Sequence, residues 1–347
     1  MNKKNLAALG LLLTLSVATL PASADYAAAV AAWDHQDYAT AFTLMRKSAE
    51  AGDKRAMESL GMLYWNGQGV GADANQAVKW LEKSANAGNA HAMDSLAKVY
   101  LAGGGGLPQD VATARRWAEK AAALGDADGE IIFYMSVISG PELNFRVDGK
   151  PDKDKYAALG KRTLAERSLD QQAYAMLGKA LDQQSPGARL YAVAEMIDKV
   201  GPGNRSRALA MFQQLPQVPK PLQLVRTALQ GLSSLGDSYT TYSTFVTAKE
   251  ALLPSVAALG SSAGVIAPGV CTQDDLKISA TAISRPLAGA VYLPATQQQL
   301  QNLYLIAGNW QEKWTFDACG KSVEIPVEFE ADGMGGAKSH PASVAAK

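Results

Sequence analysis

The sequence predicts a mainly α-helical protein, an α-solenoid of helix-turn-helix units followed by a small, disulfide-closed β-rich domain. A pattern of small and apolar residues recurs three times within residues 37–138, with spacings of 36 and 37 residues between copies. A fixed period in this range is typical of a solenoid, whose units bury their apolar faces by stacking on their neighbours. Beyond residue 270 the hydrophobic period changes from helical to alternating, which is typical of β-strands.

The first 24 residues have the three parts of a secretory signal peptide. Lys3 and Lys4 form a charged start, residues 6–20 are mostly apolar, and a small-residue segment ends at Ala24. We expect cleavage after Ala24, so that Asp25 begins the mature chain. Since Asp25 is not Cys, we expect no lipoprotein anchor, and no later segment is apolar for long enough to span a bilayer. The sequence therefore predicts a periplasmic protein, with secretion from the cell as the alternative.

The charge balance excludes two kinds of partner. The whole chain contains 33 basic and 33 acidic residues, and removing the leader takes away two of the lysines. A chain so close to neutral offers no general attraction to nucleic acid or to an anionic membrane. We therefore expect neither as a partner.

The two cysteines, Cys271 and Cys319, both lie near the C-terminal end. In an exported protein an even pair is typical of one disulfide, whereas two unpaired thiols would fit a cytosolic protein better. We expect the disulfide, which would stabilise the fold by about 3–4 kcal/mol if it is unstrained.

The repeats have the features of helical hairpins. Residues 25–33 predict an N-terminal capping helix, and the repeats with this helix occupy residues 25–140. In each unit, small and aromatic residues form one face of a first helix, a glycine ends it, and a second helix follows with Leu and Tyr inside. Asp53, Asp73 and Asp110 stand where N-caps are expected. The repeat-defining residues are Ala41, Gly52, Leu60, Gly61, Tyr64, Ala77, Trp80, Gly88, Leu96, Tyr100, Ala114, Trp117 and Gly125.

The repeats resemble Sel-1-type repeats, a relative of the tetratricopeptide repeat. The family pattern reads A-x-x-W-x-x-K-A-A, then G-D/N-x-x-A-x-x-x-L-G-x-x-Y, then G-x-G-V-x-x-D. Matching residues are Ala77, Trp80, Lys83 and Ala85, then Gly88, Asn89 and Ala92, then Gly61, Tyr64, Gly67, Gly69, Val70 and Asp73. The resemblance covers about residues 37–138. It implies scaffolding by protein binding, for example in cell-envelope or exopolysaccharide assembly.

The rest of the chain divides into four predicted segments. Residues 141–253 predict a degenerate continuation of the helical pairs, with helices near 155–166, 169–182, 187–200, 205–215 and 221–235. Residues 254–270, rich in Ala, Ser and Gly, predict a linker. Residues 271–331 predict the β-domain, with a hairpin that turns at residues 319–321 and further strands near 276–283 and 290–293. Residues 332–347 predict a disordered tail.

No pattern of catalytic or metal-binding residues is recognisable. The three histidines, His35, His91 and His340, lack ligand spacing, and there is no P-loop, Gly-x-Ser-x-Gly or cysteine cluster. Cysteine-rich members of the resembled family have been linked to β-lactam hydrolysis, but these repeats contain no cysteine. We therefore expect no enzyme, no cofactor and no metal, with a β-lactam or peptidoglycan hydrolase as the alternative of another class.

Two sets of residues are candidates for partner binding. The first are polar residues near the expected groove of the solenoid, for which ordinary solvated surface is the equal alternative: Glu58, Ser59, Asp94, Ser95 and Lys98. The second are Trp310 and Trp314, which could stack on a glycan of the envelope. Their alternating spacing also suits the core of a small β-domain, and the base rate for large aromatic side chains favours the core.

These observations lead to one functional hypothesis with an alternative. We expect a non-catalytic periplasmic adaptor that binds another envelope or secreted protein through its helical-repeat surface. A glycan bound through the C-terminal domain is a second expected partner. The alternative function is a periplasmic immunity protein that neutralises a delivered effector.

Overall fold

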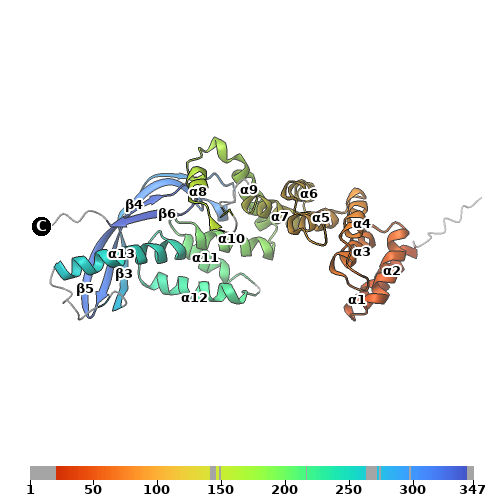
Figure 1. Cartoon of the computed structure of the whole chain (residues 1–347), viewed down its shortest axis with the longest axis horizontal. Coiled ribbons are helices and arrows are strands. Elements are labelled where there is room, and N and C mark those ends of the chain that lie inside the picture. Colours follow the sequence, from red (N-terminus) through yellow and green to blue (C-terminus); the bar gives the residue numbers. More distant parts are fainter. Residues whose placement is uncertain are drawn as a thin grey trace, which may run out of the picture. The chain divides into compact units, whose positions relative to one another are not determined.

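The computed structural model shows a mainly helical protein with one four-stranded antiparallel sheet near its C-terminal end (Figure 1). The described residues are 21–140, 146–147, 150–215, 217–262, 272, 275–296 and 298–341. None of the helices among them is both long and apolar enough to span a membrane. The chain divides into two compact units, Met1–Thr113 and Ala114–Lys347.

The first unit is an array of antiparallel helices, each of which packs on the next. Its helices are α1 (Pro21–Asp34), α2 (Tyr38–Glu50), α3 (Lys54–Asn66), α4 (Ala74–Asn86) and α5 (Ala90–Ala102). Asp53 and Asp73 cap α3 and α4, because their carboxylates accept hydrogen bonds from backbone N–H groups in the first turns. Gly52 and Gly88 follow α2 and α4 with φ of 98° and 76°, a conformation that favours glycine.

Small residues let these helices approach closely. Ala41 and Ala77 are fully buried, as are Leu60 and Leu96. A Cβ atom on Gly61 of α3 would lie only 2.7 Å from the Leu81 Cγ of α4. The repeated alanines and glycine therefore set the spacing of the helices, and the leucines fill the space between them.

The helices of the second unit continue from α6 (Val111–Ala123), within which the boundary between the units lies. They are α7 (Ala127–Ile138), α8 (Lys153–Gly160), α9 (Ser168–Asp182), α10 (Pro186–Asp198), α11 (Asn204–Phe212), α12 (Lys220–Ser234) and α13 (Tyr242–Ser262). A short strand pair, β1 (Arg146–Val147) and β2 (Lys150–Pro151), precedes α8. Five of these helices overlap the five segments that the sequence predicts between residues 155 and 235.

The sheet has the order β3-β4-β5-β6, with antiparallel neighbours throughout. Its strands are β3 (Leu276–Tyr292), β4 (Leu305–Ala318), β5 (Lys321–Ala331) and β6 (Ala337–Pro341). The predicted hairpin is β4 and β5, which join at a tight turn because Ala318 pairs with Lys321. Alternate residues of both strands are buried, and α13 packs against β5 and β6 (Figure 1).

Three predictions for the C-terminal part are wrong. The linker predicted from residue 254 is helical up to Ser262, because α13 continues past Pro254 and buries Leu252 and Val256 against the sheet. The sheet is not a separate small domain, since its core includes residues of α12 and α13. The predicted disordered tail contains β6, whose backbone pairs with β5.

Two further predictions fall outside the described residues in whole or in part. The leader over residues 1–20 lies outside them, and α1 begins at Pro21, before the expected cleavage site. Cys271 also lies outside them, whereas Cys319 is exposed in the turn between β4 and β5. The disulfide between these cysteines stays a prediction.

Candidate functional site

The first candidate site is a row of side chains on the second helices of two successive repeats. Arg55, Ser59 and Met62 occupy successive turns of α3, and His91 and Lys98 lie at the corresponding positions of α5, 36 residues later. Arg55, His91 and Lys98 are exposed, whereas Ser59 and Met62 are half-buried. Because α3 and α5 contact each other, these five residues form one surface, which we call the α3/α5 face.

The five polar residues that the sequence predicts in the groove do not all lie on one exposed surface. Ser59 and Lys98 belong to the α3/α5 face. Glu58 is half-buried and accepts a hydrogen bond from the Asn89 side chain over 3.4 Å. Asp94 and Ser95 are wrong as surface candidates, since both are buried. The Asp94 carboxylate accepts a hydrogen bond from the Lys98 ammonium over 2.7 Å, so it anchors a residue of the face from beneath.

The lysine that recurs in the repeats has a structural role. The Lys83 ammonium lies 4.1 Å from the centre of the Trp80 ring, and the Lys120 ammonium lies 4.0 Å from that of Trp117. Both distances are typical of cation–π contacts within one helix. In the first repeat, where Leu44 replaces the Trp, Lys47 instead forms an ion pair with Asp25.

Trp310 and Trp314 are wrong as candidates for glycan stacking. Both side chains are fully buried, and the Trp310 ring stacks on Phe329 with a centroid distance of 5.1 Å. Their indole N–H groups donate hydrogen bonds of 2.9 Å to opposite oxygens of the Glu312 carboxylate. A ring enclosed in this way has no face left for a sugar, so both tryptophans are core residues.

Glu312 is the centre of a buried polar network. Its carboxylate also accepts hydrogen bonds from the Ser238 hydroxyl over 2.7 Å and from the Tyr239 backbone N–H over 2.9 Å. The Ser238 hydroxyl contacts the Thr240 hydroxyl, which accepts a hydrogen bond from Arg205. Burial lowers the pKa of the Arg205 guanidinium, and the nearby Glu312 charge opposes this effect. The network ties the sheet to the segment between α12 and α13.

A second buried carboxylate joins three helices of the same unit. The hydroxyls of Tyr134 on α7 and Tyr174 on α9 both donate hydrogen bonds to Glu195 on α10. Burial and the Glu195 charge raise the pKa of both tyrosines, so they remain protonated donors. The Lys199 ammonium nitrogen lies 3.9 Å from an oxygen of the same carboxylate. This arrangement satisfies the buried charge and indicates a structural role.

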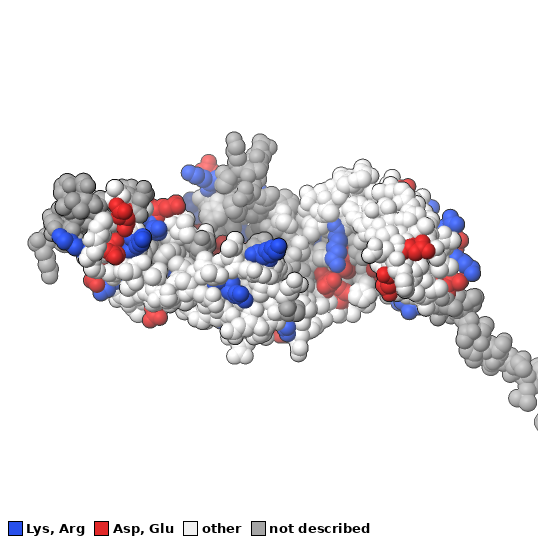
Figure 2. Space-filling view, turned by 90° about the horizontal axis from the view of Figure 1, so that it is seen from below, with Lys and Arg blue, Asp and Glu red and all other residues white. Residues whose placement is uncertain are grey.

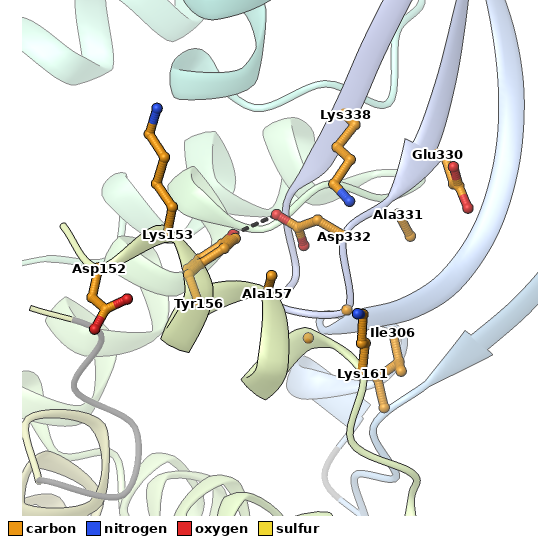
Figure 3. Close-up of a pocket in the computed structure, with 12 residues that line it drawn as sticks. Asp152, Lys153, Tyr156, Ala157, Lys161, Ile306, Glu330, Ala331, Asp332 and Lys338 are labelled. Carbon is orange, nitrogen blue, oxygen red and sulfur yellow. Dashed lines mark hydrogen bonds between the residues drawn. The ribbon is translucent and has the colours of Figure 1, made fainter.

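The second candidate site is a pocket of about 480 Å³ between α8 and the sheet (Figure 3). Its lining residues come from the start and end of α8, from β4, β5 and β6, and from the turn between β5 and β6: Asp152, Lys153, Tyr156, Ala157, Gly160, Lys161, Ile306, Glu330, Ala331, Asp332, Gly333 and Lys338. The Tyr156 hydroxyl donates a hydrogen bond to the Asp332 carboxylate, as Figure 3 shows. Burial and this hydrogen bond raise the pKa of Tyr156.

The wall of this pocket is held by contacts between distant parts of the chain. Asp332 accepts hydrogen bonds from the backbone N–H groups of Met334 and Gly336, over 2.7 and 3.0 Å. A Cβ atom on Gly333, which has a φ of 79°, would lie 1.9 Å from the Gly160 carbonyl oxygen. Only glycine allows the turn to approach the end of α8 so closely. These contacts hold the turn after β5 against the end of α8.

The described residues show no grouping of His, Cys, Asp or Glu side chains that could hold a metal ion. On the face of the molecule shown in Figure 2, basic and acidic side chains are interspersed and most of the surface is uncharged. His35 lies between α1 and α2, His91 lies on α5 and His340 lies on β6.

A protein-family model describing the Sel1 repeat matches residues 36–53, 54–89 and 90–126. These residues are three Sel1 repeats. The resemblance seen in the sequence is thereby confirmed, and the helices α2 to α6 supply most of the matched residues. Sel1 repeats mediate protein–protein interaction. No curated protein matches this chain.

Several solved structures are similar to this chain, among them the following three. A Sel1 repeat protein from Oxalobacter formigenes is 22% identical, with 50% of this chain and 77% of that chain covered and a TM-score of 0.33. The protective antigen c5321 of uropathogenic Escherichia coli, which has an SLR fold, is 18% identical, with 56% and 45% covered and a TM-score of 0.34. The immunity protein Pa5087 from Pseudomonas aeruginosa is 16% identical, with 60% and 80% covered and a TM-score of 0.27.

Sequence reasoning missed both Glu312 and the pocket, for different reasons. Glu312 had a local signal, because it stands between two tryptophans at alternating positions of a predicted strand and must share their buried face. The pocket had none, since Tyr156 and Asp332 are 176 residues apart. The glycines between Asp332 and Ala337 do signal a turn, which would have argued against a disordered tail.

Proposed function

We propose that the mature protein is a non-catalytic periplasmic adaptor that binds another envelope protein through its α3/α5 face. Three Sel1 repeats support protein binding in general, and the α3/α5 face supports this location. Its side chains form a row at the same positions of two successive repeats, outside the core in which the repeat-defining alanines and leucines are buried. Because α3 and α5 are held by close contacts, a partner would meet a preformed surface.

The composition of this face suits a protein partner. Arg55 and Lys98 have exposed cationic ends that are already oriented, by Asp53 and Asp94 respectively. Met62, at the position of α3 that corresponds to Lys98 in α5, is half-buried and adds a flexible apolar side chain, a residue type that adapts to a partner surface. We expect a few anchors of this kind to carry most of the binding free energy.

The experiment is crosslinking in the cell envelope with a tagged full-length protein, followed by affinity capture and mass spectrometry. A variant with Met62→Glu and His91→Glu places two charges on the α3/α5 face. The matched control places the same two charges on exposed positions of α4, as Asn75→Glu and Asn86→Glu. Truncation is unsuitable, because the sheet shares its core with α12 and α13.

We expect one stoichiometric partner that the control retains and the α3/α5 variant loses by at least about tenfold, since a buried unpaired charge costs more than 1.4 kcal/mol. A partner that is a component of envelope assembly would fit the adaptor, and a toxic effector would fit the immunity alternative. Capture that the α3/α5 variant leaves unchanged would contradict the proposed site, and capture of no protein would contradict the function.

The proposal includes export, cleavage after Ala24 and a disulfide between Cys271 and Cys319. These follow from the signal-peptide pattern and from the even cysteine pair. The intact mass of protein released from the periplasm tests all three, with thiol alkylation before and after reduction. We expect a chain beginning at Asp25 that takes up alkyl groups only after reduction.

A further inference from the structure

We propose that the pocket between α8 and the sheet binds a small amphipathic anion, an acidic headgroup on a short apolar chain. The pocket has a volume of about 480 Å³, within the usual range for small-molecule sites. This site is separate from the α3/α5 face, and the proposal does not depend on the proposed function.

The acidic groups of the pocket are mostly engaged by the protein itself. Asp152 caps α8 and accepts hydrogen bonds from the backbone N–H groups of Asp154 and Lys155, over 3.1 and 2.9 Å. Asp332 accepts three hydrogen bonds, from the Tyr156 hydroxyl and from two N–H groups of its own turn. These carboxylates hold the pocket together, and hydrogen bonds from the protein stabilise each of them in its ionised form.

The basic groups are not engaged in the same way. Lys161 and Lys338 are exposed, and within the described part of the chain no carboxylate oxygen lies within 4.0 Å of either ammonium nitrogen. Lys338 points from β6 toward the region of Asp332, whereas Lys153 points away from the sheet (Figure 3). Glu330, the cross-strand neighbour of Lys338, is the remaining acidic residue of the lining. Asp152 and Asp332 already accept hydrogen bonds from the protein. Apart from Lys153, the other charged groups of the lining are the two ammonium groups of Lys161 and Lys338, which outnumber the single carboxylate of Glu330.

The remainder of the lining is apolar. Ala157 of α8, Ile306 of β4 and Ala331 of β5 face the same pocket, and none of them carries a polar side chain. A ligand with only a charge would leave this surface in water, and a neutral apolar ligand would leave the two ammonium groups unused. An anion with a short apolar chain satisfies both parts.

The test is isothermal titration calorimetry of the whole mature protein at low ionic strength. The probes are octanoate and octyl phosphate below their micelle concentrations, with inorganic phosphate, octyl glucoside and phosphatidylglycerol vesicles as comparisons. We expect saturable binding of both octyl anions at one site. We expect inorganic phosphate and octyl glucoside to bind at least about tenfold more weakly, since each lacks one of the two interactions.

Two variants locate the binding at the pocket. Lys161→Glu with Lys338→Glu should weaken binding of the octyl anions at least about tenfold, because it reverses the charges that meet the headgroup. Ala157→Trp should also abolish binding, by filling the pocket without changing its charge. Lys321→Glu, at an exposed lysine that begins β5, is the control and should bind as the unmodified protein does.

All substituted positions are exposed, and matching thermal unfolding curves establish that each variant is folded. The proposal is overturned if the octyl anions show no saturable binding. It is equally overturned if folded pocket variants bind as well as the control, or if octyl glucoside binds as tightly as the anions. Binding to the vesicles alone would indicate attraction to a lipid surface and would also overturn it.

Discussion

Glu312 has a fully buried carboxylate that accepts four hydrogen bonds, two of them from tryptophans of its own strand. Each carboxylate oxygen accepts two of these hydrogen bonds. One oxygen accepts from the Trp310 indole and the Tyr239 backbone N–H, and the other accepts from the Trp314 indole and the Ser238 hydroxyl. Such a group stabilises the fold only while every donor has its acceptor. Its removal therefore has larger consequences than the removal of a surface charge.

We expect Glu312→Ala to lower the free energy of unfolding by about 3–5 kcal/mol, because it leaves two indole N–H groups and a backbone N–H without acceptors. Glu312→Gln should lower the free energy of unfolding by less, about 1–3 kcal/mol. Its amide oxygen still accepts hydrogen bonds, whereas its NH₂ group would meet donors in place of the second oxygen. Urea unfolding measures both. The control Glu324→Ala, on the exposed side of the sheet, should cost no more than about 1 kcal/mol. Equal effects at positions 312 and 324 would contradict the structural role of the network.

Glu130 on α7 makes stability depend on pH. Burial raises its pKa to about 7, with Asp126 and Asp182 adding to the effect and Lys179 opposing it. Gln183 donates a hydrogen bond to its carboxylate over 2.9 Å. Because the folded pKa lies above the usual value of 4.5, the folded state binds the proton more tightly. The stability that Glu130 contributes is therefore complete below about pH 4.5 and is lost as the pH rises through about 7.

A comparison with Glu130→Gln isolates this effect from other titrating groups. Relative to the unmodified protein, the variant should gain stability between pH 4.5 and pH 8, by up to about 3 kcal/mol. Urea unfolding at both pH values measures the difference. A stability difference that stays constant with pH would show that Glu130 does not titrate in this way.

At the scale of the element, α13 shows how packing overrides local preference. Pro254 lies inside this helix, where it lacks an N–H group for the carbonyl four residues earlier. The helix nevertheless continues, because Phe245, Leu252 and Val256 form one buried stripe against the sheet. Pro254 itself is exposed, so it removes one backbone hydrogen bond without changing the packing of the core.

We expect Pro254→Ala to raise the free energy of unfolding by about 1–2 kcal/mol, since alanine restores the hydrogen bond and removes the ring clash. Part of this gain is offset, because proline also restricts the unfolded chain. Thr247→Ala, at an exposed position of the same helix, is the control and should change stability by less than about 0.7 kcal/mol. A loss of stability in Pro254→Ala would show that the proline is required for the path of α13.

Among the elements, those with local signals were predictable. The period of the repeats predicted α2 to α5, with the aspartate caps of α3 and α4, and the alternation in residues 310–329 predicted the hairpin of β4 and β5. The continuation of α13 and the strand β6 were not, since each depends on a distant partner. For α13 that partner is the sheet, and for β6 it is β5. The same reason explains why the α3/α5 face was partly predicted and the pocket was not.

At the scale of the second unit, one core joins helices and sheet. It includes Leu232 of α12, Phe245 of α13 and Trp310 of β4, which are far apart in the sequence. The turn after β5 adds contacts to other helices, since the Gly335 carbonyl accepts a hydrogen bond from the Val200 N–H over 2.7 Å. The segment after residue 331 therefore belongs to the folded unit.

A chain that ends at residue 331 tests this conclusion. It loses β6, the Asp332 contacts and the bond to Val200, so we expect a fall in the free energy of unfolding of about 3 kcal/mol or more. A chain that ends at residue 341 keeps all of these contacts and should unfold as the full chain does. Equal stability of the two shortened chains would show that β6 is dispensable.

The sequence by itself determined the Sel1 repeats, the main helices and the central hairpin, because each depends on residues only a few positions apart. The tertiary structure decided which residues face solvent. It buried Asp94, Ser95, Trp310 and Trp314, and it placed Tyr156 beside Asp332. The physical reason is that periodicity fixes which side of an element a residue occupies, whereas the neighbour that covers that side is set by long-range packing.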